Sequence, residues 1–163
     1  MNRPNPRAIT IAPVRKIVRV NADAARAFDV FTAGFTRWWP RTHHIAKVPM
    51  KDAVLEPRVG GRWYERSEDG SECEWGKVLV WEPPARVVLG WQINNDFHYD
   101  PTKMSEVEIR FIAESAAVTV VELEHRNIDR LGAAAEEFRK KVDGPNGWGA
   151  LIQLYAAAVA ARE

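Results

Sequence analysis

Two hydrophobic patterns divide this chain. From Asn146 to Glu163, apolar residues recur at helical spacing, and no proline or glycine follows Gly149. Between residues 52 and 126, apolar and polar residues alternate instead, and turn-forming stretches interrupt the alternation. This second pattern predicts strands at 52–56, 62–67, 72–81, 86–93, 104–112 and 118–125. Their connections are too short for crossovers, so the predicted sheet is antiparallel.

The N-terminal part predicts one more strand and two short helices. Val14–Val20 has the pattern of a strand, and Asn21 is expected to cap a helix that begins at Ala22. The apolar run that follows continues until Pro40 stops it. Another short helix is expected at Leu131–Lys141, before the long C-terminal one. We expect residues 1–12 to be a flexible tail and residues 13–163 to be a single domain.

The two patterns must meet in space, because a sheet with one apolar face has to bury it. The long helix is the only large partner available, and its apolar positions are Trp148, Leu151, Ile152, Tyr155 and Val159. Strand parity places His125 on the inner face and Glu124 on the outer face. For residues 74–81, strand parity does not settle which side chains face inward, because both sets of alternating positions contain large apolar groups. A curved sheet around one helix predicts an aromatic-lined gap, where a ligand would bind.

Composition narrows the possible partners. The 163 residues suit one domain, and a formal net charge of +1 argues against nucleic-acid binding. No apolar run is long enough to cross a membrane. The single cysteine, Cys73, and the lack of an apolar segment near Met1 predict a cytoplasmic protein. The seven tryptophans are expected to line the core or a pocket.

Few residues carry recognisable chemistry. His125 has three interpretations: a hydrogen-bonded histidine at the sheet edge, a ligand contact, or a general acid–base. His43 and His44 are adjacent and match no zinc spacing. Cys73 lies between Glu72 and Glu74, and neighbouring carboxylates raise the pKa of a thiol. We therefore predict no metal, no cofactor and no catalytic residue.

Several other features have mainly structural interpretations. Gly60 and Gly61 predict a tight turn or bulge before a strand. Trp38 and Trp39 are either core residues or a cavity wall, and Trp39 is the one expected nearer the gap. The hydroxyl of Tyr155 needs a hydrogen-bond partner, which a wet pocket would provide. A solvated outer sheet face is expected for the carboxylates of Glu106, Glu108, Glu122 and Glu124.

A succession of motifs resembles a known family. The motifs are Gly60–Trp63, Gly76–Val78, Trp81–Trp91, Val121–Arg126 and Gly147–Leu154. Together they resemble bacterial members of the START-related superfamily of polyketide cyclases and lipid-transfer proteins. Within it, the chain is similar to the branch of activators of the heat-shock-protein-90 ATPase, over nearly its whole length. The resemblance implies an α+β helix-grip fold: a curved antiparallel sheet of about seven strands wrapped around a long C-terminal helix, with a deep cavity between them.

The function expected first is binding of a small hydrophobic or aromatic molecule in that cavity. The expected contacts are Trp39, Trp63, Trp91, His125, Trp148, Ile152 and Tyr155. One alternative is a co-chaperone-like interaction module with a chaperone as its partner. The other is an enzyme of the cyclase or hydrolase type in the same cavity, which we expect less than simple binding. The protein is expected to be a monomer or a homodimer.

Overall fold

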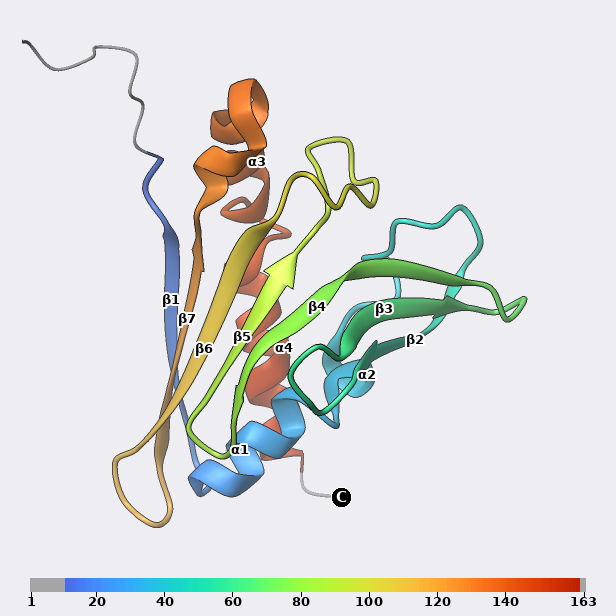
Figure 1. Cartoon of the computed structure of the whole chain (residues 1–163). Helices are drawn as coiled ribbons and strands as arrows, with labels where there is room; N and C mark the ends of the chain where they lie inside the picture. Colours follow the sequence, from blue (N-terminus) through green and yellow to red (C-terminus); the bar gives the residue numbers. More distant parts are fainter. Residues whose placement is uncertain (1–10, 162–163) are drawn as a thin grey trace, which may run out of the picture.

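One curved antiparallel sheet forms the framework of the molecule (Figure 1). In this computed structural model, residues 11–161 are described, so residues 1–10 of the predicted tail lie outside them. The seven strands lie in the order β1-β7-β6-β5-β4-β3-β2. Their bounds are β1 Val14–Val20, β2 Met50–Leu55, β3 Arg62–Ser67, β4 Glu72–Glu82, β5 Arg86–Trp91, β6 Ser105–Ala113 and β7 Thr119–Arg126.

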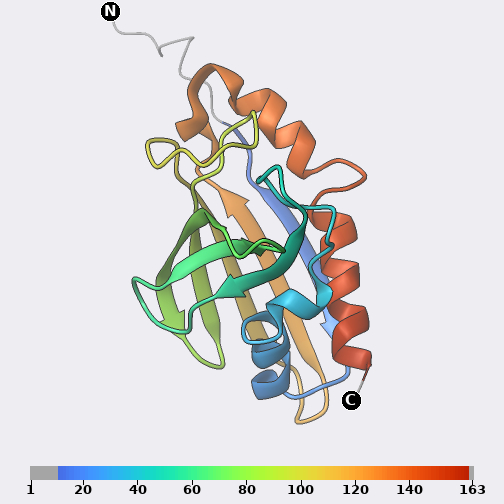
Figure 2. The same cartoon turned by 90° about the vertical axis from the view of Figure 1, so that its right-hand side faces the viewer.

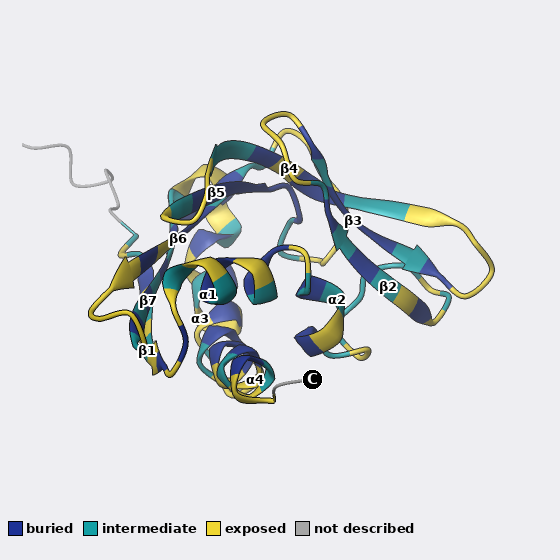
Figure 3. Ribbon diagram, turned by 90° about the horizontal axis from the view of Figure 1, so that it is seen from below, coloured by how far each residue is buried: buried dark blue, intermediate teal, exposed yellow. Residues whose placement is uncertain are grey.

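The helices lie on the concave side of the sheet (Figures 2 and 3). They are α1 Ala24–Phe31, α2 Phe35–Trp38, the 3-10 helix η1 Ile128–Ala134, α3 Ala135–Val142 and α4 Trp148–Ala160. Seen from below, α4 lies inside the curve of the sheet, and both the sheet and the helices carry dark-blue buried positions (Figure 3). The predicted α+β helix-grip fold, with its long C-terminal helix, is confirmed.

Aromatic side chains fill the core where α1, α2 and α4 meet the sheet. The ring of Tyr155 lies 5.2 Å from that of Phe31 and 5.6 Å from that of Trp38. Its hydroxyl donates a hydrogen bond of 2.7 Å to the carbonyl of Ala27. The partner of Tyr155 is therefore the backbone of α1, and burial raises the pKa of the phenol. This end of the helix–sheet interface is packed core.

Two helix boundaries differ from expectation. Helix α1 begins at Ala24, and its cap is Asp23, whose carboxylate accepts the backbone N–H of Arg26 at 2.8 Å. Asn21 is thus not the cap. The single helix expected at 131–141 is replaced by the end of η1 followed by α3, and Gly132, with a non-helical φ of 70°, places a kink inside η1.

Strand β4 contains two bulges, which explain why parity could not settle its facing. The pairing with β3 skips Trp75, and the pairing with β5 skips Leu79. Each extra residue reverses the alternation of side chains between the two faces. Between the bulges, the strands approach so closely that a Cβ on Gly76 would lie 1.7 Å from the carbonyl oxygen of Gly90.

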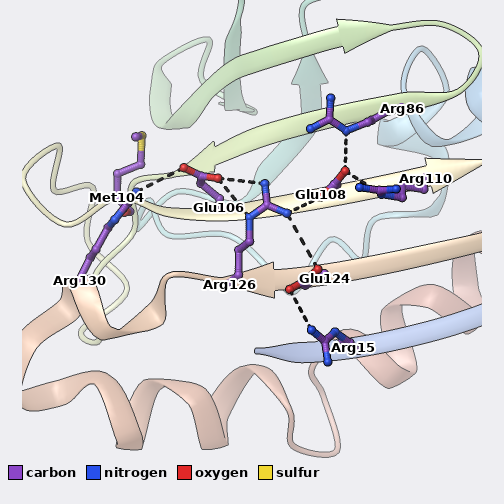
Figure 4. Close-up of polar contacts among 9 residues, drawn as sticks. All are labelled: Arg15, Arg86, Met104, Glu106, Glu108, Arg110, Glu124, Arg126 and Arg130. Atoms are coloured by element: carbon purple, nitrogen blue, oxygen red, sulfur yellow. Dashed lines mark hydrogen bonds and ion pairs between the residues drawn. The ribbon is translucent and has the colours of Figure 1, made fainter. Parts of the chain in front are cut away.

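On the outer face of β5, β6 and β7, glutamates and arginines form an ion-pair network (Figure 4). Glu108 is only 4% exposed, because three arginines cover its carboxylate. Arg86 and Arg110 donate to it at 2.5 and 2.9 Å, and Arg126 forms a third short ion pair. The expectation of a solvated face is therefore wrong for Glu108. Strand parity correctly places Glu108 on the outer face, but the two neighbouring strands place an arginine on each side of it.

Candidate functional site

A cavity of about 330 Å³ opens at the sheet end where the α2–β2 loop faces β4 and β5. The loop, residues 40–49, and the connection between β5 and β6 form its rim. Its walls are mostly aromatic or aliphatic, and the polar groups come from the loop. The lining residues are Trp39, Thr42, His43, His44, Ile45, Trp75, Trp91, Ile93 and Phe97.

A second cavity of about 170 Å³ adjoins the first and reaches the start of α4. The two have Trp39, His43, Trp91 and Phe97 in common. The second cavity adds Trp148 and other residues near the start of α4. We call the two together the aromatic pocket, because four indole rings line it.

Hydrogen bonds to the protein hold three of these indole rings in place. The Nε1–H of Trp39 donates to the carbonyl of His43 at 2.8 Å, and that of Trp91 to the carbonyl of Ile93 at 3.1 Å. The Nε1–H of Trp75 donates to Glu65 at 2.7 Å. With the polar edges satisfied, the rings present apolar surface to the pocket. The walls are therefore ordered before any ligand arrives.

Glu65 on β3 joins the loop to the sheet. Its side chain is fully buried, and one carboxylate oxygen accepts both the Trp75 indole and the backbone N–H of Ile45, the latter at 2.7 Å. The other oxygen accepts the N–H of Ala46 at 3.1 Å. Sequence reasoning missed Glu65, although a signal was present: it shares strand parity with Trp63, so a carboxylate falls on the inner face.

The two adjacent histidines have different partners. His43 Nε2 lies 2.9 Å from the carbonyl of Asn146, so this nitrogen carries the hydrogen and the ring links the loop to the approach to α4. The Nδ1 atom of His43 is 3.2 Å from the Thr42 hydroxyl. His44 Nδ1 instead lies 2.8 Å from the carbonyl of Ala46, two residues along the same loop.

His125 is fully buried behind the aromatic pocket, with both ring nitrogens hydrogen-bonded. The indole of Trp148 donates to Nδ1 at 2.9 Å, and Nε2 lies 2.8 Å from the hydroxyl of Ser105. Because an indole only donates, Nδ1 must accept, and the neutral ring carries its hydrogen on Nε2. Burial lowers the pKa of His125 to about 3. This geometry matches the interpretation of a hydrogen-bonded histidine, which here fixes the start of α4 against the sheet.

The structure brings together only some of the predicted ligand contacts. Trp39 and Trp91 line both cavities, and Trp148 lines the smaller one. Trp38 packs in the core, whereas Trp39 is buried in the core and also contributes to the cavity lining. The predicted contacts that line neither cavity are Trp63, His125, Ile152 and Tyr155, all of them buried. Ligand contact by these four stays a prediction.

Sequence reasoning also missed much of the rim. Trp75, Thr42, Ile45, Ile93 and Phe97 line the larger cavity. Trp75 falls on a bulge, where parity fails, and the loop residues belong to no periodic pattern. The density of tryptophan was the one signal that pointed toward Trp75.

The surroundings of Cys73 disfavour its thiolate. Burial raises the pKa of the Cys73 thiol, and the charges of Glu65 and Glu74 raise it further. Within residues 11–161, no group of three or more His, Cys, Asp or Glu side chains is placed to hold a metal ion.

A larger depression of about 600 Å³ lies between α1 and the end of α4. Its lining has no aromatic side chain and consists of charged and small residues such as Arg26, Asp29, Ala33 and Arg37. Small-molecule sites are usually apolar with a few polar groups, which describes the aromatic pocket better.

The curved sheet, the gripped helix and the cavity at the sheet end define a START-like helix-grip protein. The chain belongs to the family described as activator of Hsp90 ATPase homolog 1-like protein, whose family model matches residues 21–155. A comparison with curated proteins gave no match. Among residues 11–161, no helix has the length and apolar character needed to cross a bilayer.

Two solved structures are similar in both sequence and fold. One is the anthrahydroquino-gamma-pyrone synthase Txn09, at 36% identity and a TM-score of 0.64, covering 91% of this chain and 97% of that one. The other is CalC from Micromonospora echinospora, a self-sacrificing resistance protein, at 33% identity and a TM-score of 0.69, covering 93% and 98%. An Hsp90 activator from Plasmodium falciparum is 20% identical, with a TM-score of 0.51 over 71% of this chain and 73% of that one, and supports the fold alone.

Proposed function

We propose that the protein binds a small aromatic molecule in the aromatic pocket. The observation that carries this proposal is the set of ordered indole walls around a cavity of about 330 Å³, which is near the lower end of the usual range for ligand pockets. The name of Txn09 supports an aromatic polycycle as the class of ligand. The flat indole faces favour planar rings over flexible fatty chains, because offset and edge-on ring contacts add to simple burial.

The test compares two exposed aromatic residues on the β5–β6 connection. Phe97 is 41% exposed and lines both cavities, whereas Tyr99 is 40% exposed and is in neither lining. In equilibrium dialysis with naphthalene, we expect Phe97→Ala to weaken binding about 5- to 10-fold, through lost apolar and ring contact. Tyr99→Ala should stay within about twofold, and thermal unfolding should check that both variants are folded. Equal affinities in both variants and the wild type would place the ligand elsewhere.

Catalysis in the same pocket is a second candidate function, supported by the synthase relative at 36% identity. Its test is turnover of hydroxylated polycyclic substrates, followed by mass spectrometry. A bound substrate recovered unchanged after long incubation would favour binding alone.

An interaction with a chaperone is a third candidate, supported by the description of the family. The measurement is the ATPase rate of an Hsp90-type chaperone with and without this protein. An unchanged rate at saturating protein would remove this candidate and leave the aromatic pocket unaffected.

A further inference from the structure

His44 contributes one ring nitrogen to the loop and has a second that the protein leaves open. Its Nδ1 is 2.8 Å from the carbonyl oxygen of Ala46. A carbonyl only accepts, so Nδ1 carries the hydrogen and Nε2 of the neutral ring holds a lone pair. Within the described part of the chain, Nε2 forms no hydrogen bond. His44 lines the larger cavity, and 24% of its side chain remains exposed.

Glu65, on strand β3 of the sheet, holds the loop segment that carries the His44 ring. Glu65 accepts the backbone N–H groups of both residues that follow His44, and its Oε2 lies 3.9 Å from His44 Nδ1. The Glu65 side chain is fully buried on β3, so the loop cannot shift without breaking these bonds. A receptor group held in this way loses little freedom when a ligand binds.

The other nitrogen-bearing side chains that line the larger cavity are already engaged. The indole N–H groups of Trp39, Trp75 and Trp91 donate to protein acceptors. Both nitrogens of His43 have protein partners. His44 is therefore the nitrogen acceptor that this lining leaves available to a ligand.

We propose that His44 is a specificity-determining residue, which makes the aromatic pocket prefer planar aromatic molecules that carry a hydroxyl group. The phenolic O–H of the ligand donates to His44 Nε2 while its rings lie against the indole walls. This inference rests on the proposed function and names the class of ligand within it.

The test measures binding of 2-naphthol and naphthalene by equilibrium dialysis to four proteins: the wild type, His44→Phe, His44→Gln and His98→Phe. The preference is the ratio of the affinities for 2-naphthol and naphthalene. We expect His44→Phe to reduce this ratio about 3- to 10-fold, because one neutral hydrogen bond is lost, while the affinity for naphthalene stays nearly unchanged. His44→Gln should keep most of the preference, because its amide oxygen accepts. His98 is exposed and does not line the cavity, so His98→Phe should behave like the wild type.

The outcomes separate the two proposals. A preference that is unchanged in His44→Phe would overturn the role of His44 while leaving aromatic binding intact. An equal loss of affinity for both probes would also overturn it, since it would indicate lost packing rather than a lost hydrogen bond. Failure of the wild type to bind either probe would overturn the proposed function itself.

Discussion

Replacing Glu108 with glutamine should remove a measurable part of the folding free energy. Burial alone would raise the pKa of this carboxyl, but hydrogen bonds from Arg86 and Arg126 and the charges of Arg126 and Arg110 outweigh it and lower the pKa from 4.5 to about 2. At about 1.4 kcal/mol per pKa unit, this shift corresponds to about 3 kcal/mol. The arginines keep 26% to 56% of their side-chain surface exposed. We therefore expect a loss of about 2 kcal/mol.

The effect should depend on pH with a definite sign. A lowered pKa stabilises the fold fully above the unfolded-state value of 4.5, and this stabilisation is lost as pH falls from 4.5 toward 2. In urea unfolding, the difference between the wild type and Glu108→Gln should be full at pH 7. It should shrink by more than half by pH 3.

Glu122→Gln is the matched control. Glu122 lies on the same sheet face, is half-buried, and forms no ion pair among the described residues. Its replacement should change the unfolding free energy by less than about 0.5 kcal/mol. The reasoning is refuted if both variants lose the same amount, or if the Glu108→Gln difference is the same at pH 7 and pH 3.

Three further results are expected. Burial lowers the pKa of His125 to about 3, so the nitrogen chemical shifts of its imidazole should show a neutral ring with hydrogen on Nε2 at pH 5. The free energy of unfolding should decrease as pH drops below the ordinary histidine pKa of 6.5. A protonated ring at pH 5 would contradict this prediction. In Glu65→Gln, the single amide oxygen is expected at the Oε1 position, where it keeps the two donors Trp75 and Ile45, so the NH2 group faces the Ala46 N–H. Hydrogen exchange at the Ala46 amide should therefore accelerate about 10-fold while β5 amides are unchanged, and equal exchange would exclude the anchoring role. Gly76→Ala places a Cβ 1.7 Å from a carbonyl oxygen of β5, so it should lower the free energy of unfolding in urea by more than about 3 kcal/mol. The control is Gly149→Ala in α4, where the new Cβ would have no neighbour nearer than 3.8 Å, and this variant should be neutral or stabilising.

The regular part of the fold could be predicted because hydrophobic periodicity reports which face of an element is buried. The inner stripe of β7 follows strict alternation, with Val121, Leu123 and His125 all buried. The apolar positions of α4 also match its buried face. Both elements are regular along their length, so the position of a residue in the repeat predicts whether its side chain is buried.

The site could be predicted only in part, because it forms where that regularity ends. Trp75 lies on a bulge, and the loop that carries His44 and Ile45 has no period. The role of Glu65 depends on donors that lie 19 and 20 residues away in the chain. Likewise, parity gave the facing of Glu108, but only the register of the neighbouring strands reveals the arginines that bury it.

The aromatic walls also determine what an optical experiment on this protein can report. Six of its seven tryptophans form a connected series, with neighbouring ring centroids 5.4 to 6.0 Å apart. They are Trp38, Trp39, Trp63, Trp75, Trp91 and Trp148. At such separations, excitation migrates among the indoles before emission, so they behave as one chromophore. A ligand that touches any one of them quenches the shared emission: fluorescence will report that the pocket is occupied, but removing tryptophans one at a time will not reveal which ring the ligand touches.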